Sequence, residues 1–136
     1  MQFGIIDETS KVPNKLTTIE DYKNNYAILI NEIRKFGGTP IILSPVNRAE
    51  FNQNKQLVPW MGDRALAGQE VSIHHNVHFI DLNKLTGELY QELGPKGVST
   101  VIAEGDKVHY SIEGAEVICK LIAKNLPNYL KYFLEE

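Results

Sequence analysis

The stretch GGTPIILSP, residues 37–45, decides the fold of this chain. Its two glycines end the helical pattern that precedes them, and Pro45 ends the apolar run that follows. TPIILS, residues 39–44, is too apolar for a strand with one face in water. It therefore predicts a strand buried on both faces, as in a parallel sheet that helices cover.

The flanking sequence continues this alternation of strand and helix. Two further apolar runs indicate strands, and four stretches with apolar residues at helical spacing indicate helices. The predicted strands are residues 1–6, 39–44 and 77–82, and the predicted helices are residues 17–36, 60–74, 82–93 and a last one from 111. This order is typical of parallel β-α-β units with helices on both faces of the sheet. Three strands are fewer than the roughly five of a complete doubly wound sheet, which predicts a truncated α/β fold.

Local signals mark where two of these helices begin. Thr17 and Glu20 form a capping-box pattern at the start of the first helix. Ser111 is expected to cap the last helix, and Pro127 to kink or restart it. Cys119 lies on the apolar face of that helix and is predicted to be a core residue.

Composition limits the class of protein. A chain of 136 residues that is 43% hydrophobic can bury one sizeable core, so residues 1–136 are expected to form a single, partial domain. The net charge is −3 and the basic residues are scattered, which argues against nucleic acid or an anionic membrane as partner and favours a small ligand. One cysteine permits no disulfide within the chain. The beginning MQFGIIDE shows no secretory signal, which makes the cytoplasm the default expectation.

Polar residues follow each predicted strand at its carboxyl end, where open parallel sheets bind ligands. Asp7 follows the first strand, Ser44 to Arg48 follow the second, and Asp81 follows the third. The loop with Asp106 and His109 is expected to return to the same edge. This convergence favours a functional site there.

The sharpest of these signals is the pair Asp106 and His109 in GDKVHYSIEGAE, residues 105–116. A carboxylate that accepts a hydrogen bond from imidazole Nδ1 fixes the tautomer and leaves Nε2 to take a proton from a nucleophile. Three positions within a turn allow both side chains to face one way. The alternative is a solvated loop pair next to a helix cap.

The flanks of this pair resemble a known family. GDKVHYSIEGAEVICKLIAKNL, residues 105–126, resembles the closing motif of the SGNH or GDSL-type hydrolases, and MQFGIIDE is similar to their Gly-x-Asn-Asp motif. GGTPIILSPVNRAEF and FIDLNKLTGELYQELGPKG are similar to segments of the rhamnogalacturonan acetylesterase-like branch. The resemblance covers about residues 1–126 in the family's order.

This resemblance implies a three-layer, flavodoxin-like α/β/α fold and a serine esterase that acts on acetylated carbohydrate without a metal or other cofactor. The expected partner is then a small-molecule or oligosaccharide ester, and family members are often secreted. Carried over by position, His109 is the general base and Asp106 orients it. Gly4 and Asp7 would lie on the rim near the oxyanion site.

The sequence departs from the family pattern in two places. The family's asparagine, which donates to the oxyanion, falls at Ile6, whose side chain donates nothing. No Gly-Asp-Ser motif, which would supply the nucleophilic serine, occurs in the chain. We therefore expect the C-terminal portion of the domain, with its first two strands missing and with little esterase activity on its own. The alternative is a non-catalytic module for sugar binding or assembly.

Other residues have a functional and a structural interpretation. Ser44 is the one plausible substitute nucleophile, but a strand-end hydroxyl that satisfies backbone groups is the more common role. Trp60 would stack on a sugar or pack at a rim, and Arg48 would bind a substrate carboxylate or remain a solvated loop residue. Three histidines lie close together in sequence: His74, His75 and His78. They would form either a metal site or part of a polar surface.

Residues 1–6 also predict an interaction. If the first two strands are missing, this strand presents an unpaired apolar edge. Such edges recruit other strands. We expect a homo-oligomer formed through Met1 to Ile6.

Overall fold

The computed structural model describes residues 1–6 and 16–132. Within them the chain forms two compact units, the first from Met1–Pro45 and Met61–Asp81 and the second from Val46–Trp60 and Leu82 onward. Each unit has its own hydrophobic cluster. The prediction of a single domain stays a prediction.

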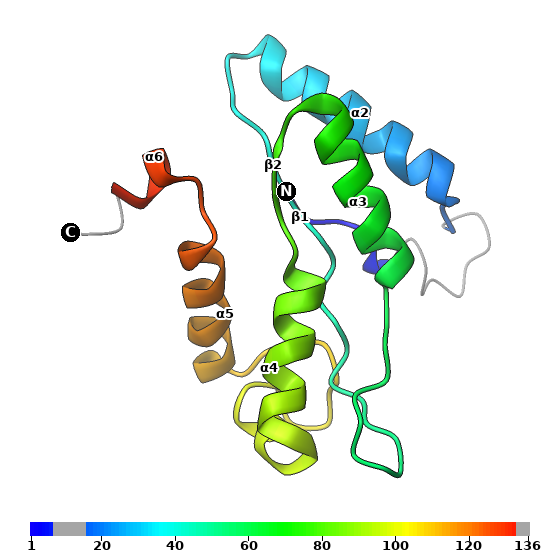
Figure 1. Ribbon diagram of the computed structural model, residues 1–136, viewed down its shortest axis with the longest axis vertical. Helices are drawn as coiled ribbons and strands as arrows, with labels where there is room; N and C mark the ends of the chain where they lie inside the picture. The colour runs from blue at the N-terminus through cyan, green and yellow to red at the C-terminus, as the bar shows by residue number, and fades with distance from the viewer. Residues whose placement is uncertain (7–15, 133–136) are drawn as a thin grey trace. The chain divides into compact units, whose positions relative to one another are not determined.

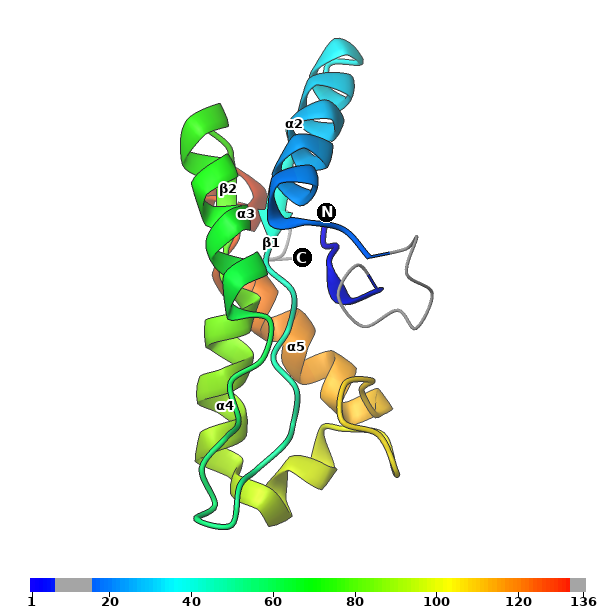
Figure 2. The same cartoon turned by 90° about the vertical axis from the view of Figure 1, so that its right-hand side faces the viewer.

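The first unit contains the predicted parallel pairing. Strands β1 (Ile41–Leu43) and β2 (His78–Ile80) are parallel, and the residue pairs in register run from Ile41 and His78 to Leu43 and Ile80. Helices α2 (Ile19–Lys35) and α3 (Gly62–His75) pack against each other, as Figure 1 and Figure 2 show. The α/β class and the parallel arrangement are confirmed, with two strands in the described residues.

The core of this unit lies where α2, α3 and β1 meet. Its buried members are Tyr22, Tyr26, Ile30, Ile42, Ala67 and Val71. The three from α2 recur every four residues, the spacing that places side chains on one helix face. Of the apolar residues whose spacing predicted this helix, these three are buried, whereas Leu29 and Phe36 are exposed.

Helix α2 begins one residue later than the sequence predicted. Its cap is Thr18, whose hydroxyl accepts a hydrogen bond of 3.0 Å from the amide of Asp21. The expected cap, Thr17, instead offers its carbonyl to the buried Arg64, whose Nη2 donates to it over 2.6 Å. Both threonines have the right chemistry for a cap, so only the tertiary contact distinguishes them.

The predicted strand at residues 1–6 is wrong in extent. Only Gln2 forms a bridge, parallel to Leu43. The backbone of Phe3 bonds to side chains instead: its amide donates to the hydroxyl of Tyr26 and its carbonyl accepts from the hydroxyl of Tyr22. These tyrosine hydroxyls take the place of a continuing ladder.

The second unit contains α4 (Leu82–Gly97), a short 3-10 turn η2 (Val98–Thr100), α5 (Ile112–Lys124) and α6 (Asn128–Lys131). Gly94 interrupts α4 with φ 66° before Pro95, close to the predicted end. Pro127 starts α6, which confirms the predicted restart. In the part of the chain that the structure describes, no helix is long and apolar enough to cross a membrane.

The last predicted helix forms, but one residue on it was misplaced. Cys119 is exposed, so its assignment to the core is wrong. The buried residues of α5 are Gly114 and Ile118. One residue along a helix turns the side chain by about 100°, so Cys119 leaves the packed face that Ile118 occupies.

Candidate active site

The loop between η2 and α5 brings Asp106 and His109 together, as the sequence predicted. The Nδ1 atom of His109 lies 2.8 Å from Oδ2 of Asp106. The side chain of His109 is 82% exposed, so the ring is open to solvent while one of its nitrogens is held by the acid. Figure 1 shows this loop in yellow beside the start of α5.

The chain around it fixes the carboxylate of Asp106. Its Oδ1 accepts the backbone amides of Lys107 at 2.7 Å, Val108 at 2.7 Å and His109 at 2.9 Å. The bonds from the amides of His109 and Val108, followed by the His109 ring, hold the pKa of this carboxyl well below its usual range. Asp106 is therefore ionised at neutral pH, with Oδ2 directed to the imidazole.

Tyr110 anchors the loop on its C-terminal side. Its side chain packs against the second unit's hydrophobic cluster, and its hydroxyl lies 3.3 Å from that of Tyr90. Burial and the neighbouring Tyr90 raise the pKa of Tyr110, so it stays protonated. Tyr110 also bridges to Ile102, and the amide of Ala103 donates to the carbonyl of His109 at 2.9 Å. The histidine thus sits on an anchored backbone.

The Ser-x-x-Gly-Ala sequence that follows has a clear structural purpose. The hydroxyl of Ser111 accepts the amide of Gly114 at 2.9 Å, and the amide of Ser111 donates to the carbonyl of Val101 at 3.1 Å. A Cβ at Gly114 would lie only 1.8 Å from the Val101 oxygen. Only glycine allows α5 to start this close to the chain that leads into the loop.

A second contact reaches the loop from residues 48–50. The amide of Ala49 donates to the carbonyl of Lys107 at 2.8 Å, and Nζ of Lys107 lies 2.8 Å from Oε1 of Glu50. Glu50 also forms an ion pair with Arg48. The hydrogen bond from Lys107 is the main cause that lowers the pKa of Glu50. Sequence reasoning missed Glu50, because no local pattern reports a pairing across 57 residues.

Two predicted ligand-binding residues also meet. The guanidinium of Arg48 lies 5.3 Å from the centre of the Trp60 ring, a cation–π geometry. Because Arg48 already pairs with Glu50, its charge is partly neutralised.

Asp106 also lies at the edge of a hollow of about 500 Å³. Ala49, Ile102 and Glu104 are among the other residues that line it. Its walls belong to the same unit as the histidine pair.

Gly4, which was predicted to lie on the rim of the site, belongs to the first unit. Gly4 is buried with φ 121°, and a Cβ there would approach Arg64, Pro45 and Tyr22 to 3.1–3.2 Å. Backbone conformation and close packing therefore both require glycine. Asp7 lies outside the described residues.

The side chain of Ser44 is buried and already bonded. Its hydroxyl donates to Oδ1 of Asp81 at 3.0 Å, and its amide donates to the carbonyl of Ile80 at 3.0 Å. Its exposure is 0%. The hydroxyl bonds to a carboxylate, whereas the structural interpretation of this residue expected a bond to backbone groups.

The histidines at the end of α3 do not form a recognisable metal site. The rings of His74 and His75 meet edge to face, with centres 4.9 Å apart. Among residues 1–6 and 16–132, no group of three or more histidine, cysteine or acidic side chains could hold a metal ion.

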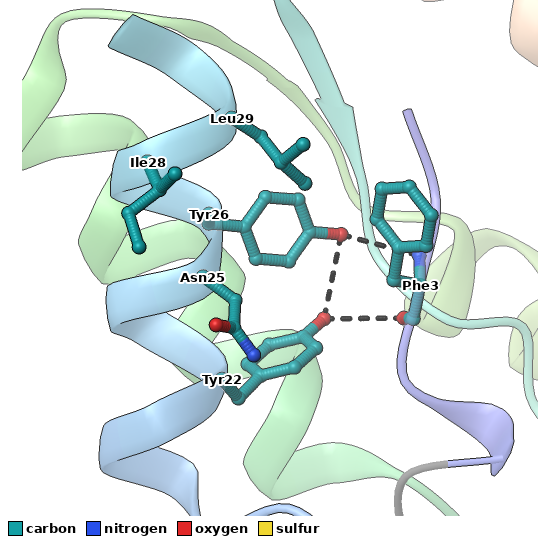
Figure 3. A pocket seen from close by; sticks show the side chains of 6 residues that line it. All are labelled: Phe3, Tyr22, Asn25, Tyr26, Ile28 and Leu29. Carbon is teal, nitrogen blue, oxygen red and sulfur yellow. Dashed lines mark hydrogen bonds between the residues drawn. The ribbon is translucent and has the colours of Figure 1, made fainter. Parts of the chain in front are cut away.

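A further hollow of about 350 Å³ lies in the first unit, along α2 (Figure 3). Tyr22 and Tyr26 line it, with their hydroxyls directed to the backbone of Phe3. Ile28 and Leu29 complete its apolar wall. None of the described residues that line it is acidic, basic or a histidine.

Comparisons with known proteins place this geometry in context. No family model matches the chain. Rhamnogalacturonan acetylesterase RhgT of Bacillus subtilis is 24% identical over 139 residues, which cover 93% of this chain and 59% of RhgT. The crystal structure of the Bacillus subtilis protein YXIM superimposes with a TM-score of 0.79 at 22% identity, over 98% of this chain and 36% of that one.

The acetylxylan esterase Axe2 of Geobacillus stearothermophilus superimposes with a TM-score of 0.69 at 18% identity. The match covers 91% of this chain and 56% of Axe2, so the chain spans only part of each of these relatives. The fold is thus part of the SGNH-hydrolase fold. The sequence is similar to that of a rhamnogalacturonan acetylesterase and the fold to part of the acetylxylan esterase Axe2, which agrees with the resemblance that the sequence motifs predicted.

Proposed function

We propose that this chain carries the acid–base pair of a carbohydrate O-acetyl esterase. Asp106 orients His109, and His109 is the general base that activates a serine. The observation that carries this proposal is the 2.8 Å contact between Nδ1 of His109 and Oδ2 of Asp106. Because Asp106 binds the Nδ1 side, the exposed Nε2 is the atom that takes the proton.

The relatives support both the residues and the reaction class. Solved variants of Axe2 that are described as catalytic mutants replace one serine, one aspartate and one histidine. The aspartate and the histidine are three positions apart in Axe2, as Asp106 and His109 are here. Axe2 and RhgT are both named as esterases of acetylated carbohydrate.

The proposed reaction has two steps. In the first, Nε2 of His109 removes the serine proton, the serine oxygen bonds to the acetyl carbon, and the sugar hydroxyl leaves with the proton from His109. In the second, a water activated by the same nitrogen releases acetate and frees the serine. As the chain contains no Gly-Asp-Ser motif, we assign the serine to a polypeptide segment that joins it.

Substrate contacts are part of the same proposal. Trp60 would stack on a sugar ring, and Arg48, which lies over Trp60, would bind a carboxylate of an acidic sugar. The pairing of Arg48 with Glu50 makes Trp60 the stronger of the two sugar contacts.

One observation favours a second function, binding of acetylated sugar without hydrolysis. Ile6 stands where the family has its oxyanion asparagine, and its side chain is 66% exposed and apolar. Loss of one oxyanion donor costs about 10²- to 10³-fold in kcat. A site that lacks this donor retains its sugar contacts.

The test measures acetate release from acetylated xylo-oligosaccharides. The chain alone is expected to give little turnover, and the chain joined to the segment of Axe2 that carries its catalytic serine is expected to give saturable turnover. His109→Ala should lower that turnover about 10⁴-fold, because the serine loses its base. His74→Ala, an exposed histidine of α3, is the matched control.

Two outcomes would contradict the esterase proposal. One is full activity of the joined protein after His109→Ala. The other is saturable binding of the oligosaccharide, measured by calorimetry, with no acetate released by any form, which favours the binding function.

We also propose that the chain forms a homo-oligomer through its N-terminal segment. Phe3, Ile6 and Ile28 are 50%, 66% and 59% exposed and form an apolar surface around that segment. Exposed apolar surface of this kind is typical of interaction sites. Light scattering should show an oligomer at micromolar concentration that Phe3→Asp dissociates, and a monodisperse monomer would contradict the proposal.

A further inference from the structure

The contacts of Glu50 suggest a role beyond those given to Asp106 and His109. Glu50 lies in the segment between β1 and α3, far in sequence from the loop with the histidine pair. It contacts that loop through one residue, Lys107, which stands between Asp106 and His109. The contact therefore reaches the middle of the four-residue turn.

Glu50 itself is held in place from several directions. Its amide donates to the carbonyl of Arg48 at 2.8 Å, and its carbonyl accepts the amide of Val58 at 2.8 Å. Its carboxylate pairs with Arg48, whose guanidinium lies over Trp60. A residue fixed in this way is a rigid anchor for the flexible side chain of Lys107.

Lys107 is bound at both of its ends. Its carbonyl accepts the amide of Ala49 at 2.8 Å, and its ammonium group lies 2.8 Å from Glu50. Its own amide donates to Oδ1 of Asp106 at 2.7 Å. A shift of Lys107 would therefore move one of the three amides that set the direction of the Asp106 carboxylate.

We propose that Glu50 is a positioning residue for the Asp106–His109 pair, and that it acts through Lys107. Glu50 holds Lys107 in place, so that the amide of Lys107 keeps its bond to Oδ1 of Asp106 and Oδ2 remains with the imidazole. This inference rests on the proposed function for its catalytic meaning. The geometry that it predicts can be measured without any catalysis.

The experiment uses NMR of the whole chain labelled with ¹⁵N. The imidazole nitrogen spectrum reports whether the neutral ring of His109 is protonated at Nδ1, and amide exchange at His109 reports its bond to Asp106. Glu50→Gln should introduce the other tautomer and speed that exchange about two- to fivefold, as expected for loss of a partly exposed ion pair. Lys107→Met should give the same change, and the double variant should give no more than either alone.

Controls separate positioning from general stability. Glu104→Gln changes an exposed carboxylate of the same loop outside these contacts and should leave the His109 signals unchanged. Asp106→Asn should abolish the preference of the neutral His109 ring for protonation at Nδ1. It therefore gives the largest change in the His109 signals against which the other variants are compared. The melting temperature of Glu50→Gln should remain close to that of the unchanged chain.

The outcomes distinguish this inference from the proposed function. The inference is wrong if Glu50→Gln and Lys107→Met leave the His109 tautomer and amide exchange unchanged while Asp106→Asn alters both. Absence of acetate release by the joined protein would overturn the esterase proposal. It would not affect the conclusion that the NMR results give about Glu50. In an active joined protein, Glu50→Gln should lower kcat and leave KM unchanged, whereas an equal effect of Glu104→Gln would count against positioning.

Discussion

Two aspartates of this chain each hold a neighbouring side chain through a hydrogen bond of similar length, in opposite surroundings. Asp81 accepts from the hydroxyl of Ser44 at 3.0 Å, next to the ends of β1 and β2, and Ser44 is fully buried. Asp106 meets His109 at 2.8 Å in a loop of the other unit, and the imidazole is largely exposed. The first pair joins residues 37 apart in sequence, and the second joins residues three apart.

The difference indicates what each pair does. A buried hydroxyl bonded to a carboxylate satisfies polar groups that folding removes from water, so its main effect is on stability. An exposed imidazole that gives one nitrogen to a carboxylate has the other available to a substrate or nucleophile. Hydrogen-bond length alone does not distinguish a structural pair from a chemical one, whereas exposure does.

The largest effect on stability should come from a substitution that separates α5 from the chain leading into the loop with Asp106 and His109. Gly114→Ala puts a methyl group where the Val101 carbonyl lies, so α5 must move away from the loop. We expect the free energy of unfolding to fall by about 3 kcal/mol, measured by urea denaturation. Gly62→Ala is the control, because a Cβ there meets nothing within 4 Å. Equal stability of the two variants would contradict the close approach of α5.

Breaking each of the two pairs in turn should give the next largest effect on stability. Ser44→Ala should lower the free energy of unfolding by about 1–3 kcal/mol, because it removes a buried partner of Asp81. His109→Ala should change stability much less, since its ring is exposed. For ester hydrolysis by the chain joined to the segment of Axe2, the order should reverse: His109→Ala should lower the rate more than Ser44→Ala does. Ser99→Ala controls for loss of an exposed hydroxyl, and a larger loss of stability for His109→Ala than for Ser44→Ala would break the comparison.

The smallest effect is a pH dependence of the exposed pair. The pKa of Asp106 is lower in the folded chain than its value of about 3.9 in an unfolded one. Its stabilising contribution is therefore fully present above pH 4 and is lost as pH falls through the folded pKa. The melting temperatures of the chain and of Asp106→Asn should differ at pH 5 and converge as the pH falls below 4. A difference in melting temperature that stays constant down to pH 2 would show that this carboxylate is not held in its charged form.

The sequence predicted elements that depend on local pattern. The helical spacing of apolar residues predicted α2, although only part of that set is buried, and the short apolar runs identified β1 and β2. The spacing of Asp106 and His109 within one turn allowed their contact, and the resemblance of the flanking sequence to the SGNH or GDSL-type hydrolases favoured it. In each case the signal lies within one short segment of the sequence, so local pattern carries the information.

What the sequence did not predict depends on distant partners. Phe3 bonds to tyrosine hydroxyls of α2 instead of continuing a strand. The carbonyl of Thr17 accepts a hydrogen bond from Arg64, and Thr18 caps α2 in its place. Glu50 reaches Lys107 across the chain through a contact that neither residue's neighbours indicate. Which side of α5 is packed, and hence the exposure of Cys119, was likewise set by tertiary contacts.

The three amides that converge on one oxygen of Asp106 have a consequence for folding kinetics. All of them come from the next three residues, so the turn closes a very short loop and loses little chain entropy. Closure of such loops takes well under a microsecond, much faster than assembly of a core from distant segments. We expect the acid and the base to meet transiently in the unfolded chain, before the strands pair, so that later folding selects this arrangement and does not have to create it.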